Sequence, residues 1–446
     1  MNDKPDTSTE PGTPLRRTLT TTLLYFFILG DVLGAGVYVL VGQVAAESGP
    51  AVWLPLAVAL GLALLTAASY AELATRFPRA GGASHYATLA YGPFVGFLAG
   101  FCMLAAGVVS VGALARGFAG DYLAEFVSLP IALVAVVFLG ALALLNLRGI
   151  SESTRANTVA TLIEVGGLVL VIGLGAWVLL RGDGDVGRLA DVGTASSGPT
   201  AAVLSGAVLG YYSFVGFETS VNVAEETRDP RRSYPRALFG ALITAGLVYV
   251  LVGCVAAAAV PTQTLVDSSG PLLEVVKEAG GVPPRVFSVV ALVAVANGAL
   301  LTGIMTSRLT FGMARDGLLP RPLTRVLPGR RTPWAAIAAT TALSLLLALT
   351  GNVATLASTL VLLLLVVFFI VNTAALVLRR KHPARGAADR DHFRAPAVVP
   401  ALGALSCVVL ATQVEAEVWL RGLIVLAVGC VLGACVTLRR RARKET

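Results

Sequence analysis

Long apolar runs constrain the fold of this chain more than any other feature. A helix that crosses a membrane needs about 20 mostly apolar residues. Charged residues make up only 13% of the 446 residues, whereas they form about a quarter of a usual soluble domain. We therefore predict an all-α polytopic membrane protein. Its twelve expected transmembrane helices cover residues 19–46, 51–75, 82–115, 130–147, 156–180, 200–225, 236–260, 284–312, 333–350, 353–378, 397–414 and 418–438.

The basic residues fall almost entirely on alternate loops between these spans. If the N-terminus is cytoplasmic, 28 of the 34 Lys and Arg residues lie in inner segments. The outer segments hold the remaining six, which are Arg116, Arg181, Arg188, Lys277, Arg285 and Arg421. Because cytoplasmic loops of membrane proteins are enriched in Lys and Arg, we expect a multi-pass protein of the plasma membrane with both termini cytoplasmic. The same bias accounts for the net charge of +8 without a nucleic-acid partner.

The chain divides into one integral domain and short polar segments. We expect a cytoplasmic N-terminal tail at 1–18, a ten-helix core at 19–378 and a cytoplasmic linker at 379–396. Peripheral helices 11 and 12 then occupy 397–438, and a basic cytoplasmic tail follows at 439–446. The outer segment 261–283 contains an apolar helical patch and is expected to cap the external end of the bundle.

Two spans are irregular in the same way. Residues 30–38 of the first span (GDVLGAGVY) and 211–218 of the sixth (YYSFVGFE) each combine glycine with an acidic residue. Glycine lets a helix unwind at low cost, and interrupted helices at matching positions of two five-helix halves are typical of transporters with inverted repeats. Freed amides would face a substrate carboxylate, and freed carbonyls would face a cation or an ammonium group. The alternative for Gly34 and Gly36 is that they only allow close helix packing.

Four stretches of the chain resemble the amino acid–polyamine–organocation (APC) transporters. They are GDVLGAGVYVLVG (30–42), YAELATRFPRAGGASHYA (70–87), SFVGFETSVNVAEETRDPRRSYPRAL (213–238) and SRLTFGMARDGLLP (307–320). The resemblance runs from about residue 19 to 438. It implies the LeuT-type fold, in which spans 1–5 and 6–10 form a 5+5 inverted repeat and spans 11 and 12 are peripheral. It also implies secondary active transport of amino acids or related amines by alternating access, with no enzyme activity, no catalytic residue and no cofactor.

The resemblance also implies which residues bind the substrate. In this family the break of the first helix binds the amino acid through backbone groups, and the break of the sixth shapes the side-chain pocket. The corresponding residues here are Gly34, Ala35, Gly36 and Val37 in the first helix and Tyr212, Ser213, Phe214, Val215 and Gly216 in the sixth. Glu218 matches an acidic position just beyond the second break and is expected to act in proton coupling or as a gate.

Two further intramembrane carboxylates depart from the family pattern. Glu164 stands where proton-coupled members often have a lysine in the fifth helix, and Asp31 stands where many members have a small apolar residue. Acidic residues inside a membrane are functional candidates by default, so we expect Glu164 to couple transport to protons, with Asp31 sharing its proton. The alternatives are that an ionised Glu164 binds sodium, or that each carboxyl group is protonated and only hydrogen-bonds to a neighbouring helix.

Acidic residues at the cytoplasmic ends of the spans also match charged positions of the family. They are Glu72, Glu225, Glu226 and Asp316. We interpret them as structural or gating ion pairs with arginines such as Arg79, Arg232 or Arg308. The alternative is a set of surface ion pairs that stabilise the fold little.

Other functions fit the sequence less well. An inorganic-cation transporter on the same fold could use the extra carboxylates, but neither break shows a cluster of metal ligands. A sensor that binds amino acids without moving them stays open as an alternative, although the chain shows no sizeable soluble signalling domain. We expect no metal site, and no HExxH or GxSxG motif indicates an intramembrane enzyme.

Overall fold

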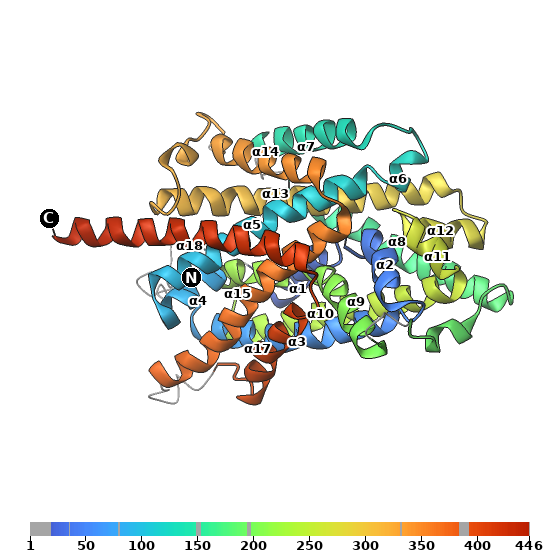
Figure 1. Cartoon of the computed structure of the whole chain (residues 1–446), viewed down its shortest axis with the longest axis horizontal. Coiled ribbons are helices and arrows are strands. Elements are labelled where there is room, and N and C mark those ends of the chain that lie inside the picture. Colours follow the sequence, from blue (N-terminus) through green and yellow to red (C-terminus); the bar gives the residue numbers. More distant parts are fainter. Residues whose placement is uncertain are drawn as a thin grey trace, which may run out of the picture.

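Helices make up nearly all of the computed structural model (Figure 1). It describes residues 19–34, 36–78, 81–148, 153–193, 198–330, 332–382 and 392–445. The predicted tail 1–18 and the centre of the predicted linker, 383–391, lie outside this range, and so does Ala35. Within the described part of the chain the pairing of extended backbone is limited to one isolated bridge, between Leu19 and Thr227. The predicted all-helical class is therefore confirmed.

The helices follow one another with short connections. The first half of the chain forms α1 (Thr21–Val32), α2 (Gly36–Ser48), α3 (Trp53–Arg76), α4 (Gly82–Tyr91), α5 (Pro93–Phe118), α6 (Asp121–Ala124), α7 (Ile131–Arg148), α8 (Ser153–Leu180), the 3-10 helix η1 (Val186–Ala190), α9 (Pro199–Tyr212) and the 3-10 helix η2 (Phe217–Glu226). The second half forms α10 (Pro230–Ala259), α11 (Thr262–Asp267), α12 (Pro271–Ala279), α13 (Pro284–Arg315), η3 (Arg321–Thr324), α14 (Trp334–Thr350), α15 (Val353–Lys381), α17 (Val398–Ala411) and α18 (Ala416–Glu445). Several of the long helices begin with proline, whose fixed φ and missing amide suit the first helical turn; they are α5, α9, α10 and α13.

Each of the twelve predicted spans contains at least one helix, but not all of these helices are long enough to cross a membrane alone. Among the described residues, eight helices have the length and apolar character to do so. A ninth forms if α1 and α2, which are bent by 46° at their break, count together. The predicted spans 333–350 and 397–414 correspond to the shorter apolar helices α14 and α17. The predicted sixth span is divided between α9 and η2.

The predicted span 82–115 is wrong in one respect, because the structure divides it into α4 and α5. Gly92 has a φ of +94°, a conformation that residues with a side chain avoid, and Pro93 starts the new helix. The two helices stay in contact, since the Ser84 hydroxyl donates a hydrogen bond to the Gly96 carbonyl at 2.7 Å. The span proper therefore begins at Pro93 and α4 is a separate short helix.

The outer segment covers one end of the bundle. The apolar patch of α12 is fully buried; its members are Leu272, Leu273, Val275 and Val276. On α11, Leu265 approaches α2 so closely that a Cβ on Gly42 would lie 2.2 Å from the Leu265 carbonyl oxygen. From α6, the Tyr122 hydroxyl donates a hydrogen bond to the Tyr38 carbonyl of α2 at 2.7 Å. These contacts hold α2 against α11, in the segment between α10 and α13, and against α6.

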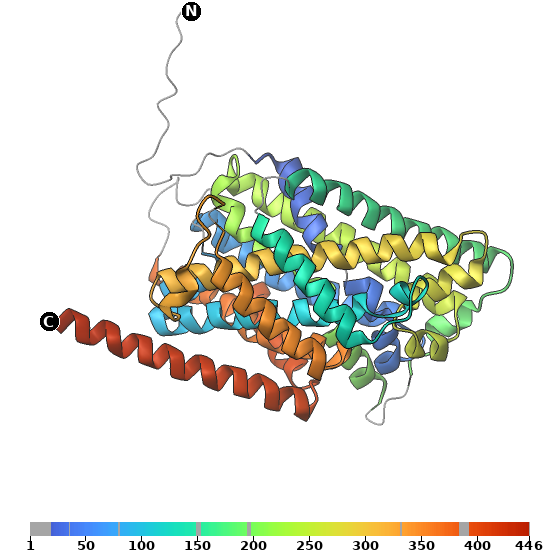
Figure 2. The ribbon, with the colours of Figure 1, turned by 90° about the horizontal axis from the view of Figure 1, so that it is seen from above.

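The C-terminal helix α18 extends along one side of the body (Figures 1 and 2). Its backbone is helical as far as Glu445, so no break separates the predicted span from the predicted basic tail. The tail sequence LRRRARKE is rich in good helix formers, which explains the continuation.

An ion pair buried inside the protein joins α3, α15 and the segment before α17. Arg379 donates from Nε to Glu72 Oε1 at 2.6 Å and from Nη2 to Glu72 Oε2. The same Arg379 Nη2 donates to the Ala395 carbonyl at 2.7 Å, and the Ala395 amide donates to Glu72 Oε2 at 3.1 Å. The Glu72 side chain is only 1% exposed. Its partner is therefore Arg379 and not one of the arginines expected from the sequence, and the pair is no surface contact.

The structure does not describe several of the other side chains that were predicted to form ion pairs. The side chains of Glu225 and Glu226 and the whole of Arg79 lie outside the described residues. Arg308 is exposed on α13.

Replacing Arg379 with methionine should destabilise the protein strongly. Removing one partner of a buried ion pair costs about 3–5 kcal/mol, because the other charge stays buried without compensation. We expect a markedly lower midpoint of thermal unfolding in detergent. The matched control is Arg380→Met, since Arg380 is exposed and adjacent. Equal midpoints for the two variants would show that the pair contributes nothing to stability.

Candidate functional site

The two helix breaks border one cavity at the centre of the bundle. It has a volume of about 180 Å³. Its wall includes both breaks, the first residues of α4, and one side each of α5, α13 and α15. No other described part of the chain combines two interrupted helices with a cavity in this way, so the cavity is the candidate binding site.

Glycines allow the two breaks to approach each other at backbone distance. A Cβ on Gly36 would lie 2.8 Å from the Cα of Ser213, in the other break. Gly216 has a φ of +128°, and a Cβ there would lie 2.8 Å from the Asp31 carbonyl oxygen. Real Cβ atoms do not approach other atoms this closely, so both positions require glycine.

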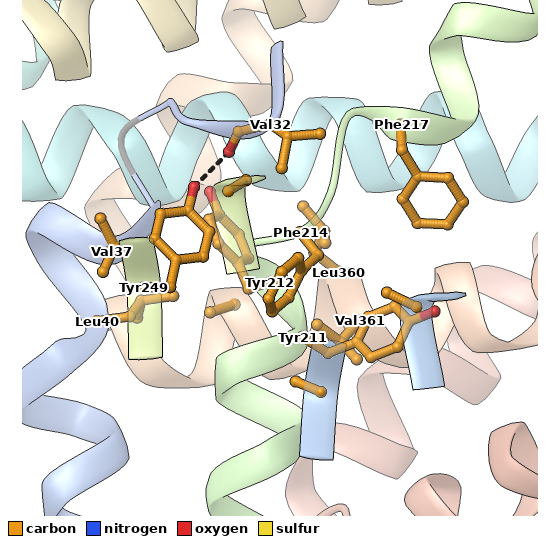
Figure 3. Packing of buried hydrophobic residues seen from close by; sticks show 14 of the residues in the cluster. Val32, Val37, Leu40, Tyr211, Tyr212, Phe214, Phe217, Tyr249, Leu360 and Val361 are labelled. Atoms are coloured by element: carbon orange, nitrogen blue, oxygen red, sulfur yellow. Dashed lines mark hydrogen bonds between the residues drawn. The ribbon is translucent and has the colours of Figure 1, made fainter. Parts of the chain in front are cut away.

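The structure brings six of the nine predicted substrate-binding residues to the cavity wall. They are Gly34, Gly36, Tyr212, Ser213, Val215 and Gly216. Val37 and Phe214 do not line the cavity; both are fully buried in the hydrophobic core beside it (Figure 3). Ala35 lies outside the described residues.

Aromatic residues of α10 and of the second break stabilise the break of the first helix. The Tyr249 hydroxyl of α10 donates a hydrogen bond to the Val32 carbonyl at 2.5 Å, as Figure 3 shows. It thereby satisfies one of the carbonyls that the end of α1 leaves without a helical partner. The Phe214 ring packs edge to face on Tyr249, with 5.3 Å between ring centroids. On the cavity side, Tyr212 and Ser110 of α5 share a hydrogen bond of 3.1 Å between their hydroxyls.

Two carboxylates line the cavity, one beside each break. Asp31 is half-buried, and its Oδ2 accepts a hydrogen bond from the Thr219 hydroxyl at 2.5 Å. Glu218 is 3% exposed, and its Oε2 accepts a hydrogen bond from the Gly216 amide at 2.9 Å. The Asp31–Thr219 contact also joins the end of α1 to η2. One oxygen of Asp31 is therefore held by η2, and one oxygen of Glu218 by the second break.

Glu164 lies behind the first break and does not line the cavity. It is fully buried on α8, where its Oε1 accepts a hydrogen bond from Asn297 of α13 at 3.0 Å, whereas no described residue donates a hydrogen bond to its buried Oε2. The Tyr38 hydroxyl donates to the Glu164 carbonyl at 2.7 Å. One helical turn earlier, Thr161 packs against Gly30, whose Cβ would lie 2.5 Å from the Thr161 hydroxyl. This face of α8 therefore lies against the first helix on both sides of its break.

The side walls of the cavity were not predicted from the sequence. From α5 come Gly100, Met103, Gly107, Ser110 and Leu114, and from α13 come Gly298, Leu301, Thr302, Met305 and Leu309. Apart from the adjacent pair Leu301 and Thr302, the members of each set follow one another at intervals of three or four residues, which is the spacing of one helix face. Small and polar residues at that spacing in otherwise apolar spans were the available signal.

Comparison with known proteins decides the family. The model of the amino acid permease family matches residues 19–429. The chain belongs to the amino acid permease family. This permease is 26% identical to the branched-chain amino acid permease of Bacillus subtilis, over 94% of its own length and 92% of the relative's. It is 29% identical to the methylthioribose transporter of the same organism, over 94% and 93% of the two chains.

A plant relative is also similar. The vacuolar cationic amino acid transporter 4 of Arabidopsis thaliana is 30% identical to this permease, over 83% of the permease and 64% of the relative. The relatives are named as carriers of chemically different substrates. The family therefore identifies the permease as a multi-pass membrane transporter and not an enzyme, but it does not identify the substrate.

Proposed function

We propose that this permease carries amino acids across the plasma membrane by alternating access, with the substrate bound between the two helix breaks. The observation that supports this most directly is the single cavity bordered by Gly34 and Gly36 on one side and by Ser213 and Gly216 on the other. We place these breaks in a LeuT-type fold of twelve spans, in which α14, α17 and the divided helix formed by α9 and η2 complete the set. Spans one to five and six to ten would then form the inverted repeats, with α17 and α18 peripheral.

The start of α2 is the proposed site of the substrate carboxylate. The first amides of a helix have no partner within the helix, and its dipole favours a negative group there. α2 begins at Gly36, which lines the cavity and lacks a side chain that would block the approach. The carboxylate of an amino acid therefore fits this end of the cavity, in the way that anions fit other helix N-termini.

The structure fits a state that is open towards the cytoplasm. The cavity wall reaches Gly81 and Gly82 at the start of α4 and Asn222 in η2. These residues lie near the ends of spans that the basic residues assign to the cytoplasm. At the other end, α11 and α12 are packed against α2. Both termini would then be cytoplasmic, with polar tails at 1–18 and 439–446, an orientation that a reporter fused to the C-terminus would measure.

Glu164 is the proposed proton-coupling residue. A carboxyl group can stay in an apolar interior in its neutral form, whereas its charged form is costly there without a partner. Among the described residues no basic side chain forms an ion pair with Glu164, and its Oε2 is buried without a hydrogen-bond partner. Its position against the first helix lets a change of protonation act on the break. Sodium binding by the ionised carboxylate is the alternative.

Uptake by the purified permease in proteoliposomes tests the proposal. We expect accumulation of labelled amino acid when the outside is acidic relative to the inside, with no requirement for sodium. Protein-free liposomes provide the background. Absence of uptake and of counterflow for every amino acid would contradict the proposed function, and uptake that needs sodium but ignores the pH gradient would contradict proton coupling.

A further inference from the structure

The cavity has an acidic corner made by Asp31 and Glu218. Each carboxylate has one oxygen occupied, by Thr219 and by the Gly216 amide respectively. No hydrogen bond from another described residue reaches the second oxygen of either side chain. Glu218 is 97% buried, since only 3% of it is exposed, and it nevertheless forms part of the cavity wall. Because Glu218 is almost fully buried and lines the cavity, a donor from a ligand would offset the cost of burying its charge.

Helix ends add to the negative potential of this corner. Asp31 lies in the last turn of α1, and the carbonyl groups at the end of a helix carry a partial negative charge. The second break follows the last turn of α9, which ends at Tyr212 and presents the same kind of helix end. None of the described residues that line the cavity is basic. A positively charged group is therefore the ligand group that fits between Asp31 and Glu218.

The rest of the cavity wall is mostly apolar. Its large apolar side chains include Met103 and Leu114 of α5, Leu301, Met305 and Leu309 of α13, and Leu360 and Leu364 of α15. A second charged group placed among them would lose its hydration without a compensating partner. Methionine adapts its shape to different apolar groups. This wall fits an apolar side chain and disfavours a charged one.

We propose that Asp31 and Glu218 bind the ammonium group of the substrate and that the Met- and Leu-lined wall takes an apolar side chain. The ligand class is then primary amines with an apolar side chain, among them amino acids such as leucine. This inference rests on the proposed function and goes beyond it, because it assigns the amine to two carboxylate side chains. The ammonium group, more than the carboxylate, then decides whether a compound binds.

Four probes separate the contributions of the substrate groups in the wild-type permease. They are leucine, 3-methylbutylamine (leucine without its carboxylate), 4-methylpentanoate (leucine without its amine) and lysine. At equal concentration, a ligand that binds the folded state more tightly raises the thermal unfolding midpoint further. We expect stabilisation by leucine, weaker stabilisation by 3-methylbutylamine, and little by lysine or 4-methylpentanoate. A 4-methylpentanoate that binds as well as 3-methylbutylamine would overturn the inference without any variant.

Isosteric variants then test the two carboxylates. Hydrogen bonds to charged groups contribute about 1.5–3 kcal/mol, so Asp31→Asn and Glu218→Gln should each weaken binding of leucine and 3-methylbutylamine roughly tenfold to a hundredfold. Binding of 4-methylpentanoate should not weaken. Asp191→Asn is the control, since Asp191 is exposed and distant from the cavity wall. If either cavity variant fails to fold, Thr219→Val keeps both charges but removes the contact to Asp31, and it should weaken amine binding less than the loss of a charge.

The outcomes distinguish this inference from the proposed function. If leucine binds and is taken up but both isosteric variants bind it with unchanged affinity, the ammonium site is wrong and the proposed function stands. If no amino acid stabilises or crosses with the wild-type permease, the proposed function itself is wrong. Tighter binding of lysine than of leucine would overturn the assignment of the apolar wall.

Discussion

Substrate binding should be lost when Gly36 is replaced by leucine. Even the first carbon of a side chain at this position would lie 2.8 Å from the Cα of Ser213. The obstacle is backbone, which cannot rotate away, so the two breaks would have to separate. Overpacking of this kind costs about 1–3 kcal/mol, and the displaced amides at the start of α2 would no longer meet the carboxylate. We expect leucine affinity to fall by about a hundredfold or more.

The same change at a tolerant glycine provides the control. A Cβ on Gly166, in the middle of α8, would meet no atom within 4 Å, so Gly166→Leu should fold and bind normally. Binding is measured by the ligand-induced rise of the unfolding midpoint, and folding by size-exclusion chromatography in detergent. A well-folded Gly36→Leu protein with wild-type affinity would place the substrate outside the two breaks.

Glu164→Gln should separate substrate binding from proton-driven accumulation. Glutamine has nearly the same shape and can still accept the hydrogen bond that Asn297 donates to Oε1. It cannot gain or lose a proton in the physiological range. A gradient of one pH unit is worth about 1.4 kcal/mol per proton, which supports about tenfold accumulation for one proton per substrate. We expect this accumulation, driven by an acidic exterior, to disappear while counterflow exchange continues.

Proteoliposome uptake at several imposed pH gradients measures the effect. Glu417→Gln is a suitable control because the Glu417 carboxylate forms an ion pair with Arg421 on the surface, where its side chain is 64% exposed. If Glu164→Gln accumulates substrate with unaltered pH dependence, the glutamate has only a structural role. Leucine affinity should be unaffected in this variant, in contrast to Asp31→Asn, because Glu164 does not line the cavity.

The two breaks were predictable because their cause is local. Glycine next to an acidic residue in an apolar span signals both flexible backbone and a functional group. The division at Gly92 and Pro93 had an equally local signal, since a Gly–Pro pair ends or interrupts a helix. The long apolar run on either side of it masked that signal.

Contacts between distant parts of the chain were not predictable in the same way. Arg379 follows Glu72 by 307 residues, and several arginines nearer in sequence were equally plausible partners. The same holds for Asn297, which contacts Glu164 across 133 residues. Helix periodicity assigns residues to one face of a helix, but which helices meet depends on packing. The side walls of the cavity depend on the same packing.

The Glu72–Arg379 pair has a mechanical consequence for the transport cycle. It joins α3, in the first proposed repeat, to α15, in the second. Both side chains also form hydrogen bonds with the main chain of Ala395. Separating the two helices at this end would strip two desolvated charges of their partners and break two backbone contacts at once. We expect α3 and α15 to travel together as one rigid unit here. The two proposed repeats then cannot slide past each other at this contact. The segment before α17 moves together with α3 and α15 in every transport cycle.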